Sequence, residues 1–144
     1  MQINDLKIIF IICVILIMID IPVLIYVNKD TYLVNFKNIN NGEINFTKLK
    51  ILSALLCYLI MAFGLYYFSV KEKNILNALI LGFVINGIYN TTNYATLNKY
   101  SLNVAIIDTI WGPTLMTTVA YLVIRFNGWF ELIERSSLHI NINL

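Results

Sequence analysis

Charged residues, histidine and cysteine are all scarce in this sequence. Only 12% of its 144 residues are charged, about half the share of an ordinary soluble domain. One histidine and two cysteines are too few for a zinc site or a disulfide framework. The basic residues form no cluster and the net charge is only +2, so we expect no nucleic-acid partner. We also expect no metal and no cofactor.

Apolar residues are abundant instead, because they make up 59% of the chain and gather into long runs. A soluble chain of this composition would expose large apolar patches and aggregate. A helix needs about 20 mostly apolar residues to cross the roughly 30 Å hydrocarbon core of a bilayer. Four runs meet this requirement, at residues 8–27, 49–70, 75–96 and 102–124. We therefore predict an all-α fold, a transmembrane four-helix bundle in a single domain whose partner is the lipid bilayer.

Two polar segments lie outside the predicted spans. Residues 28–48 are rich in Asn and lack a clear period, which predicts a loop. Asn127 and Gly128 predict a helix stop after the fourth span. Residues 127–144 then suit either a short helix lying in the membrane interface or a disordered tail.

We name the side of the membrane that carries residues 28–48 the B side, and the opposite side the A side. Five Lys or Arg residues fall on each side, so the positive-inside rule assigns no orientation. The abundance of Asn, Ile and Lys is typical of an AT-rich genome. This composition suits an integral protein of a bacterial inner membrane, or of a host or virion membrane if the source is a virus.

Polar residues interrupt the spans at one level. An aspartate inside a span costs at least about 2.5–3.5 kcal/mol on insertion scales, so it should face the bundle. Asp20 and Asp108 both lie about 9–10 Å from the B-side ends of their spans. Asn86, Asn90 and Asn93 have spacings that put them on one face of the third span. We expect these acids and amides to meet in the B-side half of the bundle.

Two functional interpretations of this polar layer stay open. In the first, the layer forms a pocket near the B side that binds or conducts a small solute, an ion or a proton. Four spans are few for a transporter, so this interpretation predicts a homo-oligomer. In the second, the layer only holds the bundle together, in a scaffold, a partner subunit or a viral envelope component. An enzyme is the least favoured interpretation, because the sequence has no HExxH motif and no glycine-rich phosphate loop.

Residues 76–113 resemble the signature of a family of small predicted membrane proteins of unknown function, mostly bacterial and with four spans. The stretch YNTTNYATL (89–97) is similar to the family motif Y-D-x-T-N-x-A-T-L, and DTIWG (108–112) is similar to D-x-x-W-G. The sequence departs from the family at Asn90, where the family has Asp, and at Val23, where it has Trp. The resemblance implies an architecture and a polar site but no activity, and no residue is assigned a catalytic role. The predicted pocket residues are Asp20, Asn86, Tyr89, Asn90, Thr92, Asn93, Thr96, Asp108 and Trp111.

Overall fold

The computed structural model describes the backbone of residues 3–27, 29–42 and 46–142, and the side chains as far as residue 126 apart from Val27. The described residues form helices and no strand. The helices are α1 (Ile3–Pro22), α2 (Lys29–Ile39), α3 (Lys48–Leu65), α4 (Ile75–Thr96) and α5 (Leu102–Ile142). Two of them continue into π-helical segments, α1 into Val23–Val27 and α3 into Tyr66–Val70. The all-α class predicted from the sequence is confirmed.

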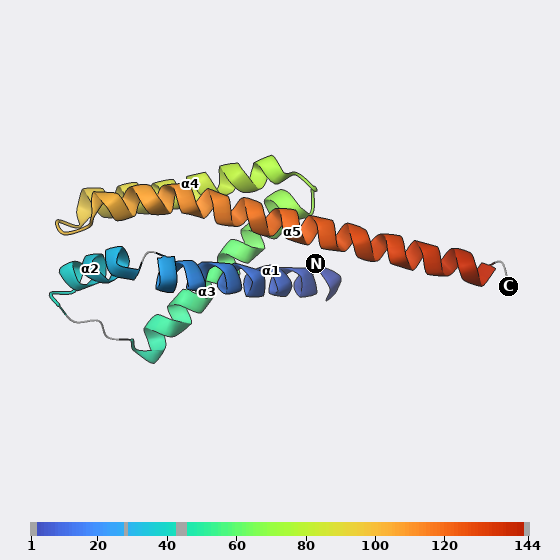
Figure 1. Ribbon diagram of the computed structural model, residues 1–144, viewed down its shortest axis with the longest axis horizontal. Coiled ribbons are helices and arrows are strands. Elements are labelled where there is room, and N and C mark those ends of the chain that lie inside the picture. The colour runs from blue at the N-terminus through green and yellow to red at the C-terminus, as the bar shows by residue number, and fades with distance from the viewer. Residues whose placement is uncertain (1–2, 28, 43–45, 143–144) are drawn as a thin grey trace.

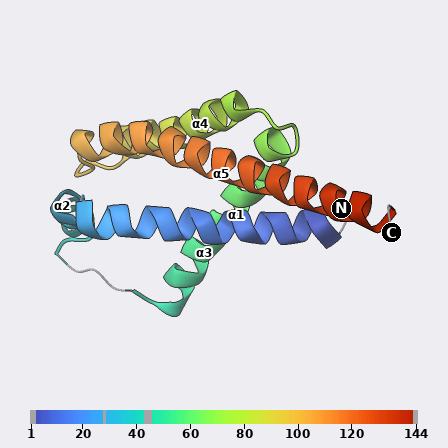
Figure 2. The same cartoon turned by 45° about the vertical axis from the view of Figure 1, so that its right-hand side comes forward.

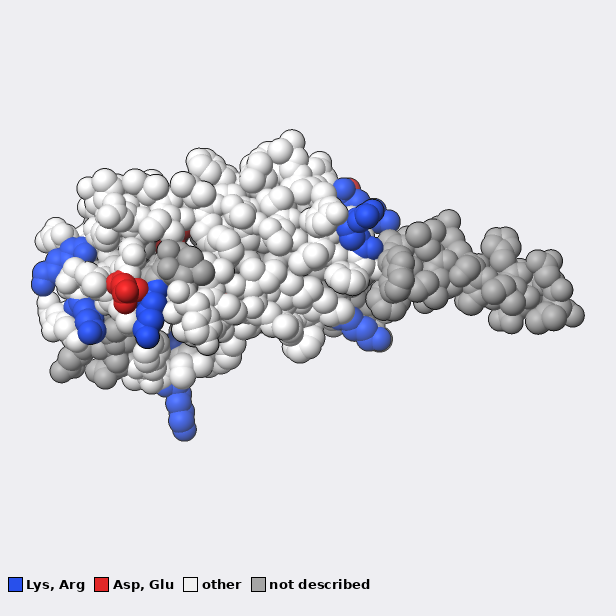
Figure 3. Space-filling view, in the orientation of Figure 1, with Lys and Arg blue, Asp and Glu red and all other residues white. Residues whose placement is uncertain are grey.

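Four helical stretches are long and apolar enough to cross a membrane. They are Ile3–Tyr26, Lys48–Val70, Ile75–Thr96 and Leu102–Phe126. Figure 3 shows lysine and arginine side chains at both ends of the molecule, with an almost uncharged surface between them. A bilayer requires such a band, because charged side chains are costly in its hydrocarbon core. The transmembrane four-helix bundle is therefore confirmed, with a first helix that begins at Ile3, five residues earlier than the predicted span.

The hairpin of α4 and α5 forms the most closely packed part of the bundle. The two helices run side by side in both ribbon views (Figures 1 and 2) and are joined by residues 97–101. Helix α1 packs against both α5 and α3. Helix α3 crosses α1 obliquely, so that its first half leaves the bundle (Figure 1). Leu52 and Leu55 in that half are 62% and 50% exposed, which puts them against lipid tails.

The apolar core lies in the A-side half of the bundle. Ile12 and Leu16 of α1, Leu65 of α3 and Val119 of α5 have no exposed surface, and they belong to one cluster with the neighbouring residues of all four spans. Dispersion contacts stabilise such a core in lipid, where apolar burial alone drives little association. This apolar cluster lies between the polar B-side layer and the A side.

Small residues bring α4 and α5 together in the middle of the membrane. A Cβ atom added at Gly82 would lie 2.6 Å from the Cα atom of Pro113. A Cβ atom added at Gly112 would lie 1.9 Å from Nδ2 of Asn86. Both distances are well inside van der Waals contact, so Gly82 lets its backbone approach that of Pro113, and Gly112 leaves room for the Asn86 side chain.

Helix α2 lies within residues 28–48, so the prediction of a loop there is wrong over Lys29–Ile39. Tyr32 and Asn35 are 7% and 2% exposed, and their spacing puts them on one face of the helix. The hydrophobic period failed to reveal α2 because one tyrosine and one asparagine replace the usual aliphatic residues on its buried face. Contacts with the rest of the protein stabilise this helix.

Both ends of α2 are stabilised by charges that favour the helix dipole, and its C-terminal end also has a cap. Asp30 lies in the first turn and Lys37 in the last, so each charge opposes the nearby end of the helix dipole. Asn41 and Gly42 follow the helix with φ values of 55° and 96°. The Gly42 amide donates to the Lys37 carbonyl at 2.7 Å, which is the bond of a Schellman cap.

The fourth span continues beyond the membrane as one helix. The predicted stop at Asn127 and Gly128 is wrong, because α5 runs without a break to Ile142. Figure 1 shows this extension continuing along the axis of α5 over residues 127–142, while its placement in the membrane interface stays a prediction. A glycine inside a helix costs only about 1 kcal/mol relative to alanine. Each further residue of an established helix adds a hydrogen bond that offsets this cost. Residues 143–144 lie outside the described residues.

Candidate functional site

Asp20 lies where three helices meet. Its Oδ2 atom accepts a hydrogen bond from the Tyr58 hydroxyl of α3 at 2.7 Å. Its Oδ1 atom accepts a hydrogen bond from Nε1 of Trp111 in α5, also at 2.7 Å. One aspartate on α1 therefore ties α3 and α5 together, and both of its donors are uncharged.

Asp108 lies one turn before Trp111 on α5 and has a different partner. The Tyr32 hydroxyl of α2 donates a hydrogen bond to its Oδ1 atom. Three residues of an α-helix rise by about 4.5 Å. Because Trp111 contacts Asp20, the two aspartates lie within about one helical turn of each other along the bundle. The structure thus brings Asp20, Asp108 and Trp111 together, while their role in a ligand pocket stays a prediction.

The asparagines of α4 are bonded separately from the aspartates. Asn90 has no exposed surface, and its Oδ1 atom accepts a hydrogen bond from the Tyr100 hydroxyl at 2.7 Å. The Nδ2 atom of Asn90 donates to the Asn86 carbonyl at 2.9 Å. The Asn86 amide in turn donates to the carbonyl one turn earlier on α4. These side chains pack α4 against α5 without a hydrogen bond to either aspartate.

Tyr100 lies in the connection of residues 97–101, outside the spans. Burial raises the pKa of its hydroxyl above the usual tyrosine value, and the nearby Tyr89 acts in the same direction. A hydrogen bond with the partly buried Asn93 opposes this shift. A tyrosine is already protonated at neutral pH, and the raised pKa extends to higher pH the range in which Tyr100 donates to Asn90.

Three predicted site residues of α4 are exposed. Tyr89 is 58% exposed, and Thr92 and Thr96 are exposed as well. The Thr96 hydroxyl donates to the Thr92 carbonyl of its own helix at 2.8 Å. Within the described side chains, no hydrogen bond joins any of the three to Asp20, to Asp108 or to the donors of these aspartates. The structure therefore does not bring these three residues to the aspartates.

Four residues outside the predicted site supply much of its hydrogen bonding: Tyr32, Asn35, Tyr58 and Tyr100. Asn35 accepts a hydrogen bond from the Ser101 backbone amide at 2.8 Å. A carboxylate in hydrocarbon needs donors, and a tyrosine offers one on an otherwise apolar ring. This argument could have identified Tyr58 as a donor to Asp20, because the two residues lie at the same depth in their spans. Tyr32 and Asn35 could not, because they lie in the segment predicted as a loop.

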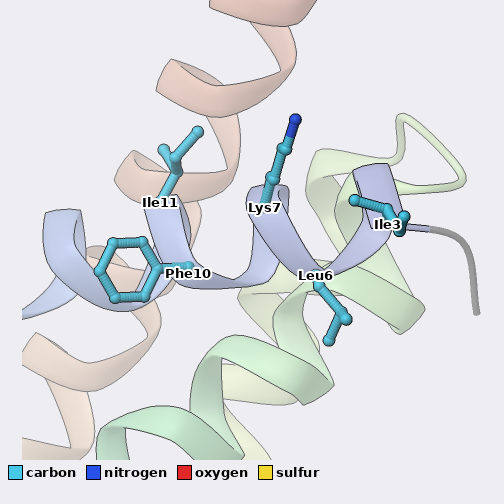
Figure 4. A pocket seen from close by; sticks show the side chains of 5 residues that line it. All are labelled: Ile3, Leu6, Lys7, Phe10 and Ile11. Atoms are coloured by element: carbon cyan, nitrogen blue, oxygen red, sulfur yellow. The ribbon is translucent and has the colours of Figure 1, made fainter.

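The buried polar atoms of this layer are all hydrogen-bonded. Every buried side-chain nitrogen or oxygen in the described part of the chain has a hydrogen-bond partner. Within the same residues, no three His, Cys, Asp or Glu side chains gather as metal ligands would. A surface groove lies elsewhere, on the A-side half of α1 (Figure 4), and is apolar apart from one lysine. Its lining residues are Ile3, Leu6, Lys7, Phe10 and Ile11.

These features define the protein as an integral membrane protein with four spans and two aspartates bonded between its helices. Its sequence matches a family described as predicted membrane proteins, DUF2177, over residues 6–124. The chain belongs to this family, whose function is unknown. The match confirms the resemblance to a family of membrane proteins of unknown function. Comparisons with curated proteins and with solved structures give no match.

Proposed function

We propose that the protein binds a proton or a small monovalent cation between Asp20 and Asp108, in the B-side half of the membrane. The observation that carries this proposal is the chemistry of the groups that contact the two carboxylates. Tyr58, Trp111 and Tyr32 all donate to them as uncharged groups. Within the described side chains, no Lys, Arg or His bonds to either aspartate.

An ionised carboxylate in hydrocarbon is costly unless a positive charge compensates it. Without a cationic side chain nearby, such a group is neutralised by a proton or a bound cation. The charges of Asp20 and Asp108 also lie close enough to repel each other. One positive charge held between them relieves the desolvation cost and the repulsion together, which supports a shared binding site.

The apolar core supports exchange with the B side alone. Ile12, Leu16, Leu65 and Met116 fill the bundle on the A side of the aspartates and are at most 1% exposed. Hydrocarbon side chains offer no partner to a proton or cation on its way through the bundle. We therefore propose binding and release at the B side, without passage across the membrane.

Infrared difference spectroscopy on the protein in lipid nanodiscs tests this proposal. The C=O stretch of a protonated carboxyl group should rise and fall with pH, and sodium or potassium should shift that titration if a cation competes with the proton. Asp20→Asn and Asp108→Asn should each remove or displace the titrating band. Asp30→Asn, at an exposed position of α2, should leave it unchanged.

A structural role is the second candidate, and the complete hydrogen bonding of the polar layer favours it. In that case Asp20 and Asp108 only hold helices together. The infrared band would then be the same in wild type, Asp20→Asn and Asp108→Asn, provided that circular dichroism shows all three proteins folded. That outcome would refute the binding proposal.

A further inference from the structure

Helix α2 covers one face of α5 at its B-side end. Ser101, Ala105 and Asp108 have the spacing of one helical face. Asn35 of α2 accepts a hydrogen bond from the Ser101 amide at 2.8 Å, and Tyr32 of α2 donates to Asp108. Ala105 lies between these two contacts and is only 7% exposed. These two hydrogen bonds hold α2 beside residues 101–108, at the start of α5 and next to Asp108.

Two side-chain hydrogen bonds between described residues join α2 to Asp108 of α5 and to Ser101 just before that helix. Isolated helices shorter than about 12–15 residues are marginal in water, and α2 has 11 residues. Its other face is exposed at Lys29, Asp30, Val34 and Lys37. Figures 1 and 2 show α2 at the B-side end of the bundle, beside the ends of α1 and α5. Helix α2 can therefore move away from α5 without disturbing the packing of the four spans.

We propose that α2 is a gate that closes the B-side approach to Asp108, and that the Tyr32–Asp108 hydrogen bond is its latch. This inference rests on the proposed function, because it describes how the ligand of the aspartate pair enters. The latch uses the same carboxylate that the ligand needs. A proton or cation from the B side reaches Asp108 only when Tyr32 has withdrawn and α2 has moved off α5.

Thiol labelling of Ala105→Cys measures the gate directly. The variant is made in a chain that carries Cys13→Ala and Cys57→Ala, and is placed in lipid nanodiscs with a water-soluble maleimide. Adding Tyr32→Phe keeps the ring and removes the hydroxyl. An interhelical hydrogen bond in a membrane contributes about 1–2 kcal/mol at most, so the labelling rate should rise by about 5–30-fold. Tyr89→Phe, which alters an exposed hydroxyl, should leave the rate unchanged.

Hydrogen–deuterium exchange provides a second measurement that needs no introduced cysteine. Tyr32→Phe should speed amide exchange in residues 29–39 by a similar factor and leave exchange in α4 as it is in the wild type. Equal labelling and equal exchange in wild type and Tyr32→Phe would overturn the gate. Neither measurement involves a bound ion, so the gate can fail while the carboxyl band still titrates. Conversely, the wild type could lack a titrating carboxyl band while Tyr32→Phe still speeds labelling. That result would refute the proposed function and leave α2 as a movable cover.

Discussion

Replacing Gly82 by alanine should push α4 and α5 apart. The added Cβ atom would lie 2.6 Å from Cα and 3.0 Å from the nitrogen of Pro113. Both obstacles are backbone atoms, so no change of rotamer can relieve the contact. To restore ordinary van der Waals distance, the helices must separate by about 0.8 Å. The loss of packing along the hairpin should cost about 1–3 kcal/mol, the usual range for overpacking.

Gly87 provides the matched control on the same helix. A Cβ atom added there meets nothing within 4 Å. Gly82→Ala and Gly87→Ala share the gain in helix propensity of about 1 kcal/mol. The difference in unfolding free energy between the two variants therefore isolates the cost of separating the helices.

Unfolding in mixed detergent micelles, followed by circular dichroism during titration with sodium dodecyl sulfate, measures this difference. Gly87→Ala should be as stable as the wild type or more so, and Gly82→Ala should be the less stable of the two variants. The usual error of such comparisons is about 0.5 kcal/mol. If the unfolding free energies of the two variants agree within this error, Gly82 does not contact Pro113 as closely as described.

Three other changes test separate contacts. Gly112→Ala should lower the unfolding free energy by about 1–3 kcal/mol, and Asn86→Ala should cancel most of this cost in a double-mutant cycle by removing the obstructing side chain. Tyr58→Phe removes one of two donors to Asp20 and should cost about 1–2 kcal/mol, but almost nothing in an Asp20→Leu background. Tyr100→Phe should reduce stability at neutral pH. The pKa of Tyr100 is raised above its usual value of 10.0, so the unfolded chain loses this proton first, and the advantage of wild type should shrink as the pH rises above 10.

The same unfolding assay supplies the controls for these changes. Tyr89→Phe should match the wild type, because the Tyr89 side chain is largely exposed. A Gly112→Ala cost that persists without the Asn86 side chain would contradict the proposed clash. An equal effect of Tyr58→Phe with and without Asp20 would contradict that hydrogen bond. A constant difference between wild type and Tyr100→Phe from pH 8 to pH 11 would contradict the role given to burial of the Tyr100 hydroxyl.

The spans and the level of the aspartates could be predicted because lipid imposes simple rules on sequence. A helix must carry about 20 apolar residues to cross, and an acid within it must avoid the acyl chains. Those two rules were enough to place Asp20 and Asp108 at a common depth. The spacing of Asn86 and Asn90 likewise predicted that this side of α4 faces into the bundle, since an unbonded amide is also costly in lipid; the predicted meeting of these amides with the aspartates is not seen among the described hydrogen bonds.

The parts that could not be predicted depend on single contacts between distant segments. Helix α2 owes its place to one tyrosine that reaches Asp108 and one asparagine that reaches Ser101, and neither forms a hydrophobic period. Thr92 and Thr96 looked equally suitable as site residues by composition. In the structure both are exposed, and Thr96 bonds to its own helix, because local motifs do not encode which neighbour a side chain will meet.

The position of Asp20 near the start of the chain has a consequence for biosynthesis. Asp20 precedes its donor Tyr58 by 38 residues and its donor Trp111 by 91. During translation the first span thus enters the membrane with an acid that has no partner. It is also the most apolar of the four spans, which offsets the insertion cost of about 2.5–3.5 kcal/mol for a central Asp. The carboxylate gains its second donor only after the span that carries Trp111 has been delivered, so a chain cut before Trp111 keeps an acid that lacks this donor.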